Sequence, residues 1–162
     1  RVGAGIAQGL AFGADLPVIA VSNLTAMAQA AFELHQAENV AAAIDARMNE
    51  VYFSQLKREK VRSDLGEFFQ WNPVIEEQVC QPEKVLEQFS DLTAYRVGTG
   101  WAAYPQFKDS GLEGSDIILP SAQYMLELAL TDYAQNKVIS ALEIEPVYLR
   151  NEVTWKKLPG RE

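Results

Sequence analysis

The sequence predicts an α/β protein in which a mixed β-sheet is flanked by helices. Three observations lead to this class. Of the 162 residues, 48% are hydrophobic and 22% charged, a balance typical of globular domains. Apolar runs separated by turn residues follow one another over residues 39–79, as in antiparallel strands. From residue 82 onward, helical apolar repeats alternate with short strand-like runs.

Residues 2–13 predict a helix with two distinct faces. Residues four apart share a helix face, so a glycine stripe and an apolar stripe both form. The stripes comprise Gly5, Gly9 and Gly13, and Val2, Ile6 and Leu10. Each helical glycine costs about 1 kcal/mol relative to alanine, which close approach of another backbone would offset. Either both stripes pack within a missing part of this chain, or they form a helix-to-helix interface with a partner.

A strand and a second helix are expected next. Residues 18–22 form a short apolar run after the turn at 14–17, as in a buried strand. Asn23 is expected to cap a helix ending near Gln36. Its apolar face would consist of Leu24, Met27, Ala28, Ala31 and Leu34. His35 lies beside this face, where a structural role is expected rather than a catalytic one.

The middle of the chain predicts the antiparallel part of the sheet. Strands over 39–45 and 51–57 form a hairpin around a tight turn at 46–49. Residues 58–65 are expected to be a charged loop, followed by a strand over 67–71. Asn72 and Pro73 should break that strand, and an edge strand follows over 74–79.

The remainder predicts alternating helices and strands. We expect a helix starting at Pro82, a strand over 95–97 running into Gly98, and a helix or irregular turn reaching Phe107. A strand over 116–119 and a helix capped by Ser121 follow. The inward face of that helix should hold Ala122, Met125, Leu126, Ala129, Leu130 and Tyr133.

This order matches a ribonuclease-H-like lobe, the unit that is duplicated in actin-like and sugar-kinase-like ATPases. Residues 1–37 would then be the remnant of a preceding N-terminal lobe, with its interface helix, strand and helix. Residues 38–145 would be the C-terminal ribonuclease-H-like lobe, and 146–162 a tail. The given sequence starts at Arg1, which is followed at once by a helical pattern, so we expect the beginning of the chain to be missing.

Two places could carry chemistry. Asp45 ends the first strand of the lobe, where an acidic residue can take part in a metal or phosphate site. It could equally be a turn-forming residue. Gly98, Thr99 and Gly100 follow a strand, where backbone N–H groups can cradle phosphate or glycine can simply allow the turn. Together they would suit a sugar-kinase-like ATPase lobe. A ribonuclease-H-like nuclease is less favoured because two-metal chemistry needs several converging carboxylates.

Composition excludes several other classes. The formal charge of −8 argues against this chain binding nucleic acid without a partner protein. Residues 148–157 nevertheless form an aromatic and basic tail, a composition that can bind RNA. The single cysteine, Cys80, and the single histidine allow neither an internal disulfide nor a structural zinc site, which favours a reducing compartment. No apolar run approaches the ~20 residues of a membrane span, so no membrane contact is expected.

Five segments spread along the whole chain carry a family resemblance. They are residues 1–11 (RVGAGIAQGLA), 44–47 (IDAR) with 50–52 (EVY), 97–101 (VGTGW), 145–151 (EPVYLRN) and 155–160 (WKKLPG). Together they resemble the bacterial TsaB family, also called YeaZ, and especially its gammaproteobacterial members. Members carry a further GPGSFTG stretch before the position of Arg1, so the chain would span roughly the last two-thirds of the family.

The resemblance implies a cytoplasmic protein with an actin-like fold and a role in making threonylcarbamoyladenosine on tRNA. It implies a non-catalytic scaffold that pairs with the metal-bearing transferase TsaD, works with the ATPase TsaE and also forms homodimers. The helix at 2–13 would be one of its interface helices, and tRNA would be contacted indirectly. No cofactor is expected in this chain itself, whereas ATP or ADP could bind at the assembled complex. The glycoprotease or peptidase label attached to such proteins is less favoured, because the histidine-rich metal motif of TsaD is missing from this sequence.

Overall fold

The computed structural model describes residues 2–63 and 66–150, and it confirms the α/β class. Four strands form one sheet in the order β3-β2-β1-β4. β1 (Asn39–Arg47), β2 (Glu50–Ser63) and β3 (Gly66–Cys80) are antiparallel neighbours. The short β4 (Tyr95–Val97) pairs with β1 in parallel, through Val40 opposite Tyr95. The sheet is therefore mixed, and β1 is the inner strand that has one antiparallel and one parallel neighbour.

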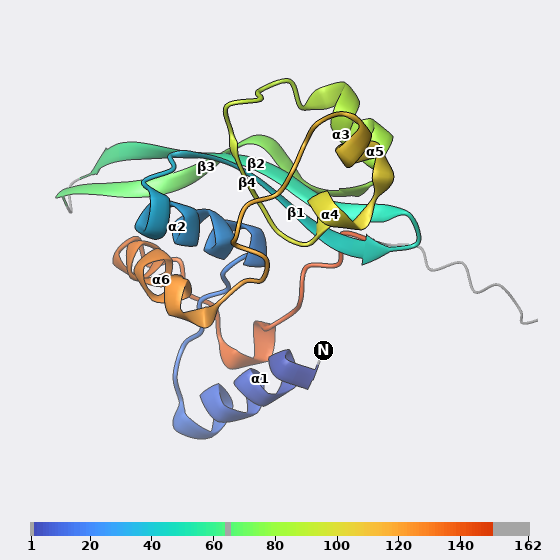
Figure 1. Cartoon of the computed structure of the whole chain (residues 1–162). Helices are drawn as coiled ribbons and strands as arrows, with labels where there is room; N and C mark the ends of the chain where they lie inside the picture. The colour runs from blue at the N-terminus through green and yellow to red at the C-terminus, as the bar shows by residue number, and fades with distance from the viewer. Residues whose placement is uncertain (1, 64–65, 151–162) are drawn as a thin grey trace, which may run out of the picture.

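Both faces of β1 are buried, because its alternating residues enter two separate cores. Ala41 and Ala43 face a core built around Trp101, whereas Val40 and Ala42 face a core that contains Met27. Such small side chains allow helices to lie close on either side. Figure 1 shows α2 (Asn23–His35) on one face and three short helices on the other, α3 (Pro82–Gln88), α4 (Gly100–Ala103) and α5 (Pro105–Asp109).

α2 follows its predicted course with a small shift at its start. Ser22, not Asn23, is the N-cap, and its hydroxyl accepts a hydrogen bond from the backbone N–H of Leu24. The helix ends as predicted, with Gln36 in a left-handed conformation. Most of the predicted apolar face is buried, but Leu34 is exposed.

The predicted loop at 58–65 and the break at Pro73 are both wrong. β2 continues to Ser63, and β3 runs through Pro73, which pairs with Leu56 beside a register shift. β3 is an edge strand, so proline can occupy it without removing a hydrogen bond to a further strand. The charged stretch over 58–62 therefore belongs to a long strand rather than to a loop.

Two predicted strands are missing from the described residues. At 18–22, only Val18 forms an isolated bridge, with Ile139, through two backbone hydrogen bonds of 2.9 Å. At 116–119, the chain makes one backbone contact with the loop after β4, where the carbonyl of Ile117 accepts from the N–H of Gly98 at 2.8 Å. An apolar run becomes a strand only where another strand is available to pair with it.

The C-terminal helix forms, but its orientation differs from the prediction. Ser121 caps the 3-10 helix η1 (Ala122–Tyr124), which leads into α6 (Met125–Ala134). Of the residues expected inward, Met125 and Ala129 are half-buried and Ala122 is exposed. Leu126, Leu130 and Tyr133 have exposed fractions of 68%, 60% and 64%. α6 contacts α2, and the predicted face is only partly covered within the described residues.

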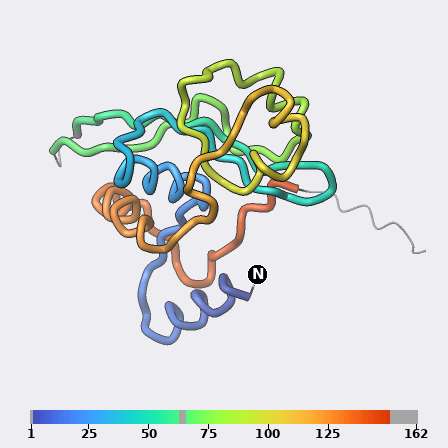
Figure 2. Tube along the Cα trace, in the orientation of Figure 1, coloured from blue at the N-terminus to red at the C-terminus, as the bar shows by residue number. Residues whose placement is uncertain are grey.

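The first helix and a short 3-10 helix near the end of the described chain lie beside each other at the bottom of Figure 1. α1 (Val2–Ala14) contacts the 3-10 helix η2 (Ala141–Glu143), and the side-chain amide of Gln8 donates to the carbonyl of Ala141 at 2.9 Å. From η2 the chain returns to the sheet (Figure 2). There Arg150 pairs with Glu50 of β2. Of the predicted aromatic and basic tail, Arg150 is thus described, whereas Trp155, Lys156 and Lys157 lie outside the described residues.

Candidate functional site

Asp45 lies at the end of β1, where the strand enters its turn to β2. Its Oδ1 accepts hydrogen bonds from the hydroxyl of Tyr104 at 2.7 Å and from the N–H of Arg47 at 2.9 Å. The Tyr104 bond is the main reason that the pKa of Asp45 is lowered, and the Arg47 N–H adds to it. Its Oδ2 lies 3.4 Å from the guanidinium of Arg47, so both carboxylate oxygens have partners within the chain.

The turn that follows has an unusual backbone. Arg47, Met48 and Asn49 all have positive φ angles, of 62°, 56° and 59°. Left-handed backbone costs roughly 1–2 kcal/mol for each residue with a side chain, so three in a row require support from their surroundings. The Asp45 carboxylate gives part of that support by holding the Arg47 N–H. The side chains of Arg47 and Met48 are exposed at the tip.

Tyr104 and Arg150 complete this support. The hydroxyl of Tyr104 lies 3.1 Å from the carbonyl oxygen of Glu50, and the pKa of this tyrosine is raised, mainly by burial and then by the Asp45 carboxylate. The guanidinium of Arg150 donates to Oε2 of Glu50 and, at 3.3 Å, to the carbonyl of Arg47. No local pattern in the sequence distinguished Tyr104. Arg150 was noted only as part of the basic tail, because its contact with the turn depends on tertiary packing.

The structure brings the two predicted candidate sites together. Thr99 accepts a hydrogen bond through its hydroxyl from the backbone N–H of Asp45 at 3.0 Å. Gly98 and Gly100 are buried against β1. A Cβ at Gly98, where φ is +104°, would lie 2.1 Å from the carbonyl oxygen of Ala43, and one at Gly100 would lie 2.9 Å away. These glycines allow the loop to cross β1 at close range, and the N–H of Gly98 already donates to Ile117.

The predicted interface residues lie together on an open surface of α1. The helix has no buried residue, and Val2, Ile6 and Leu10 have exposed fractions of 59% to 79%. A Cβ added at Gly5, Gly9 or Gly13 would meet no heavy atom within 4 Å in the described part of the chain. Both stripes are therefore accessible. An apolar cavity of about 670 Å³ lies between the second half of α1 and residues 138–142, and none of the stripe residues lines it.

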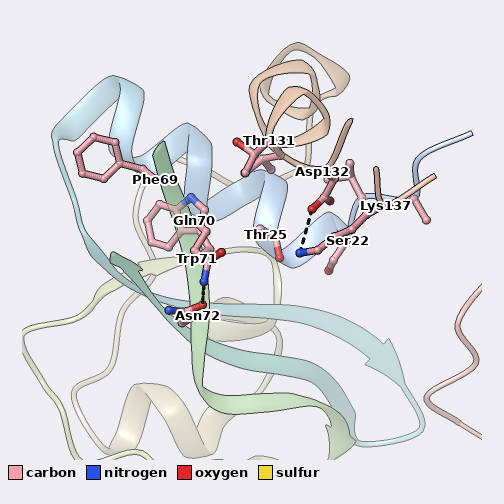
Figure 3. A pocket seen from close by; sticks show the side chains of 12 residues that line it. Ser22, Thr25, Phe69, Gln70, Trp71, Asn72, Thr131, Asp132 and Lys137 are labelled. Carbon is pink, nitrogen blue, oxygen red and sulfur yellow. Dashed lines mark hydrogen bonds and ion pairs between the residues drawn. The ribbon is translucent and has the colours of Figure 1, made fainter. Parts of the chain in front are cut away.

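A second cavity, of about 340 Å³, lies far from Asp45 between the start of α2, β3 and the end of α6 (Figure 3). Its wall combines aromatic rings, amides and hydroxyls with an ion pair between Lys137 and Asp132 of 3.6 Å. Among the residues labelled in Figure 3 are Ser22, Thr25, Phe69, Gln70, Trp71, Asn72 and Thr131. The cavity is a small polar recess and shares no residue with the predicted sites.

Neither a metal-binding cluster nor a membrane-spanning helix occurs in the described part of the chain. No group of three or more histidine, cysteine, aspartate or glutamate side chains is arranged to hold a metal ion within residues 2–63 and 66–150. Within the same ranges, no helix combines the length and apolar character needed to cross a lipid bilayer.

Comparison with known proteins places the chain in a family. Residues 1–151 match the family model of TsaD, described as tRNA N6-adenosine threonylcarbamoyltransferase. The tRNA threonylcarbamoyladenosine biosynthesis protein TsaB of Haemophilus influenzae is 76% identical over all 162 residues, which span 69% of its length. TsaB of Escherichia coli is 46% identical, again over the whole chain and 69% of its own length.

Solved structures agree with this assignment. A Pseudomonas aeruginosa protein described as similar to the peptidase YeaZ is 34% identical, with a TM-score of 0.75 over 93% of this chain and 67% of its own. A second structure, YeaZ from Pseudomonas aeruginosa, gives a TM-score of 0.73 over 91% of this chain. The mixed sheet flanked by helices is thus the ribonuclease-H-like, actin-like fold that the sequence predicted, and the chain belongs to the TsaB (YeaZ) family of TsaD-related proteins.

Proposed function

We propose that this chain is a non-catalytic partner subunit in the threonylcarbamoyladenosine modification of tRNA. In this role it binds and supports a TsaD transferase, together with the ATPase TsaE, and contacts tRNA through the assembly. The observation that carries the proposal is the open surface of α1, where an apolar stripe and a glycine stripe lie side by side. Such a surface suits close packing against a helix of a partner or of a second copy.

The geometry around Asp45 supports a structural role for that residue. A catalytic carboxylate or a phosphate loop needs groups that remain available for a ligand. Here Asp45 Oδ1 accepts from the Tyr104 hydroxyl and the Arg47 N–H, and Oδ2 lies 3.4 Å from the Arg47 guanidinium. The N–H of Gly98 likewise donates within the chain. The expectation that follows is a subunit that acts through binding, by favouring the competent arrangement of its partner.

The same reasoning extends to domain organisation and location. We propose that residues 1–37 are part of an N-terminal lobe and that residues 38–145 form the C-terminal lobe, with a tail over 146–162. The apolar run at 18–22, which pairs only through Val18, would then join a sheet of that N-terminal lobe. A cytoplasmic location agrees with the proposed work on tRNA.

A charge placed on the apolar stripe tests the proposal. In the full-length protein, Ile6→Glu should abolish both co-purification with TsaD and self-association, because a carboxylate would be buried against an apolar surface without a partner. Leu92→Glu is the matched control, since Leu92 is similarly exposed but lies in the loop before β4. Unchanged pull-down and unchanged elution from a sizing column for Ile6→Glu would disprove the interface.

A second candidate function is a sugar-kinase-like ATPase lobe that uses Asp45 and the loop 98–100. Its support is the contact between Asp45 and Thr99, which puts both predicted elements at one place. Titration of the full-length protein alone with ATP separates the two functions. Tight binding with turnover favours the ATPase, whereas turnover that needs TsaD and TsaE favours the partner subunit.

A further inference from the structure

The strands β2 and β3 continue past the body of the protein as a two-stranded arm, which we define as residues 57–63 and 66–72. Figure 2 shows this arm extending beyond α2. Its base is anchored by the guanidinium of Arg58, which lies 3.6 Å from the ring centroid of Phe32 in α2. Nearby, the indole N–H of Trp71 donates to the side chain of Gln29 at 2.9 Å. The arm is thus attached at its base and exposed toward its tip.

The arm has the opposite charge to the rest of the molecule. Four of the 14 lysines and arginines fall within six consecutive positions, at Lys57, Arg58, Lys60 and Arg62. Residues 57–72 contain three acids, Glu59, Asp64 and Glu67, so their formal charge is +1 in a chain of −8. A positively charged region attracts a polyanion, whereas the acidic surface of the rest of the protein repels it.

The pairing register places two exposed cations on one face of the arm. Lys60 lies opposite Phe69, and Arg62 lies opposite Glu67, so these four side chains project from the same side. The side chains of Lys60 and Arg62 are 50% and 81% exposed. They are two residues apart on a strand, which separates them by about 7 Å. Both can therefore contact one extended chain of negative charges.

Glu67 holds these cations in place without neutralising both of them. Its carboxylate pairs with Lys60 and, at 2.6 Å, with Nε of Arg62. Exposed ion pairs contribute only about 0–1 kcal/mol, so a phosphate can replace the carboxylate as partner. Phe69 adds an aromatic ring beside them, and its position is fixed by the Arg58 guanidinium, 3.7 Å from the ring centroid. Cations beside an aromatic ring form the usual surface for an RNA strand.

We propose that the arm contacts the tRNA backbone, with Lys60 and Arg62 bound to phosphates and Phe69 against an adjacent sugar or base. This inference rests on the proposed role in tRNA modification and adds a direct contact by this subunit. The contact is sequence-independent because phosphates carry no base identity. It supplements binding by the partners, since two cations supply only part of the affinity for a polyanion.

The test measures binding of an unmodified tRNA transcript to the full-length protein in complex with TsaD, over a range of salt concentrations. Lys60→Glu/Arg62→Glu should weaken binding at least tenfold at low salt. The slope of log K against log salt should fall by about one to two, because each lost phosphate contact removes roughly 0.7–0.9. Lys84→Glu/Lys108→Glu, which reverses two exposed lysines of α3 and α5, should leave both quantities nearly unchanged.

A variant that is expected to strengthen tRNA binding controls for loss of binding through misfolding. Glu67→Gln removes the acid that competes with phosphate, so it should strengthen tRNA binding two- to fivefold. Weaker binding by Glu67→Gln, or wild-type affinity and slope for the double charge reversal, would overturn the arm contact. Loss of TsaD binding with tRNA affinity unchanged would show that the arm binds protein and would also overturn it. Failure of the wild-type complex to support tRNA modification would instead disprove the proposed function.

Discussion

Arg150 pairs with Glu50 across 100 positions of the sequence, with Nε of the arginine 3.0 Å from Oε2 of the glutamate. The pair fastens the last described segment to the turn between β1 and β2. The same guanidinium donates to the carbonyl of Arg47, one of the three left-handed residues of that turn. The C-terminal segment is therefore part of the structure around Asp45.

Removing the arginine should destabilise the protein. Arg150→Ala leaves Glu50, whose side chain is 29% exposed, without its cation and removes a bond to a strained turn. We expect a loss of about 1–2 kcal/mol in the free energy of unfolding, measured by urea denaturation. Arg62→Ala should cost less than about 0.5 kcal/mol, because that ion pair is on the surface. Equal losses for the two variants would contradict a special role for Arg150.

Tyr104→Phe should change how stability depends on pH. The hydrogen bond from Tyr104 is the largest cause of the lowered pKa of Asp45. A carboxyl whose pKa is lower in the folded state stabilises the fold above its unfolded pKa, about 3.9, and this contribution disappears as pH falls through the folded pKa. The variant should therefore lose less stability than the wild type between about pH 6 and pH 2.

The Tyr104→Phe comparison uses the difference between the two proteins, because other carboxyls such as Asp91 and Asp116 also have lowered pKa values. Denaturation at several pH values gives that difference, and NMR titration of the Asp45 carboxyl should show its pKa rising in the variant. An unchanged Asp45 pKa would contradict the assignment of the hydrogen bond.

Gly98→Ala should be far more damaging than Gly111→Ala. Both glycines have positive φ, so both substitutions strain the backbone by about 1–2 kcal/mol. Only at Gly98 would the new Cβ also collide with the carbonyl oxygen of Ala43, whereas it meets no heavy atom within 4 Å at Gly111. We expect a loss above about 3 kcal/mol for Gly98→Ala, seen as poor soluble yield or a sharply lowered Tm. Similar Tm values would rule out the close approach.

Gly9→Ala should act in opposite directions on stability and on binding. The added Cβ meets no heavy atom within 4 Å, and alanine is favoured over glycine by about 1 kcal/mol inside a helix. The helix content of the free protein, followed by circular dichroism on heating, should therefore be retained to higher temperature. Partner binding should weaken at the same time, because the glycine stripe would no longer allow a close backbone. Tighter binding to TsaD would contradict this use of the stripe.

The local pattern of residues was enough for much of the architecture. The apolar runs in 39–57 predicted the β1–β2 hairpin, and the capping signals assigned to Asn23 and Ser121 predicted the starts of helical segments within a residue. Asp45 and the loop 98–100 stood out in the sequence, because an acid at a strand end and paired glycines after a strand both indicate a special backbone or a binding role. These features depend on neighbours within a few positions, which a sequence displays directly.

Tertiary structure decided what those elements contact. Pro73 continues β3 because no strand lies beyond it in the described residues, and residues 18–22 form only one bridge because no sheet there pairs with them. The outward face of α6 and the meeting of Asp45 with Tyr104 likewise depend on residues far apart in the chain. A repeat pattern specifies that a segment has an apolar face or a free edge, but the partner of that face is fixed only when the whole chain packs.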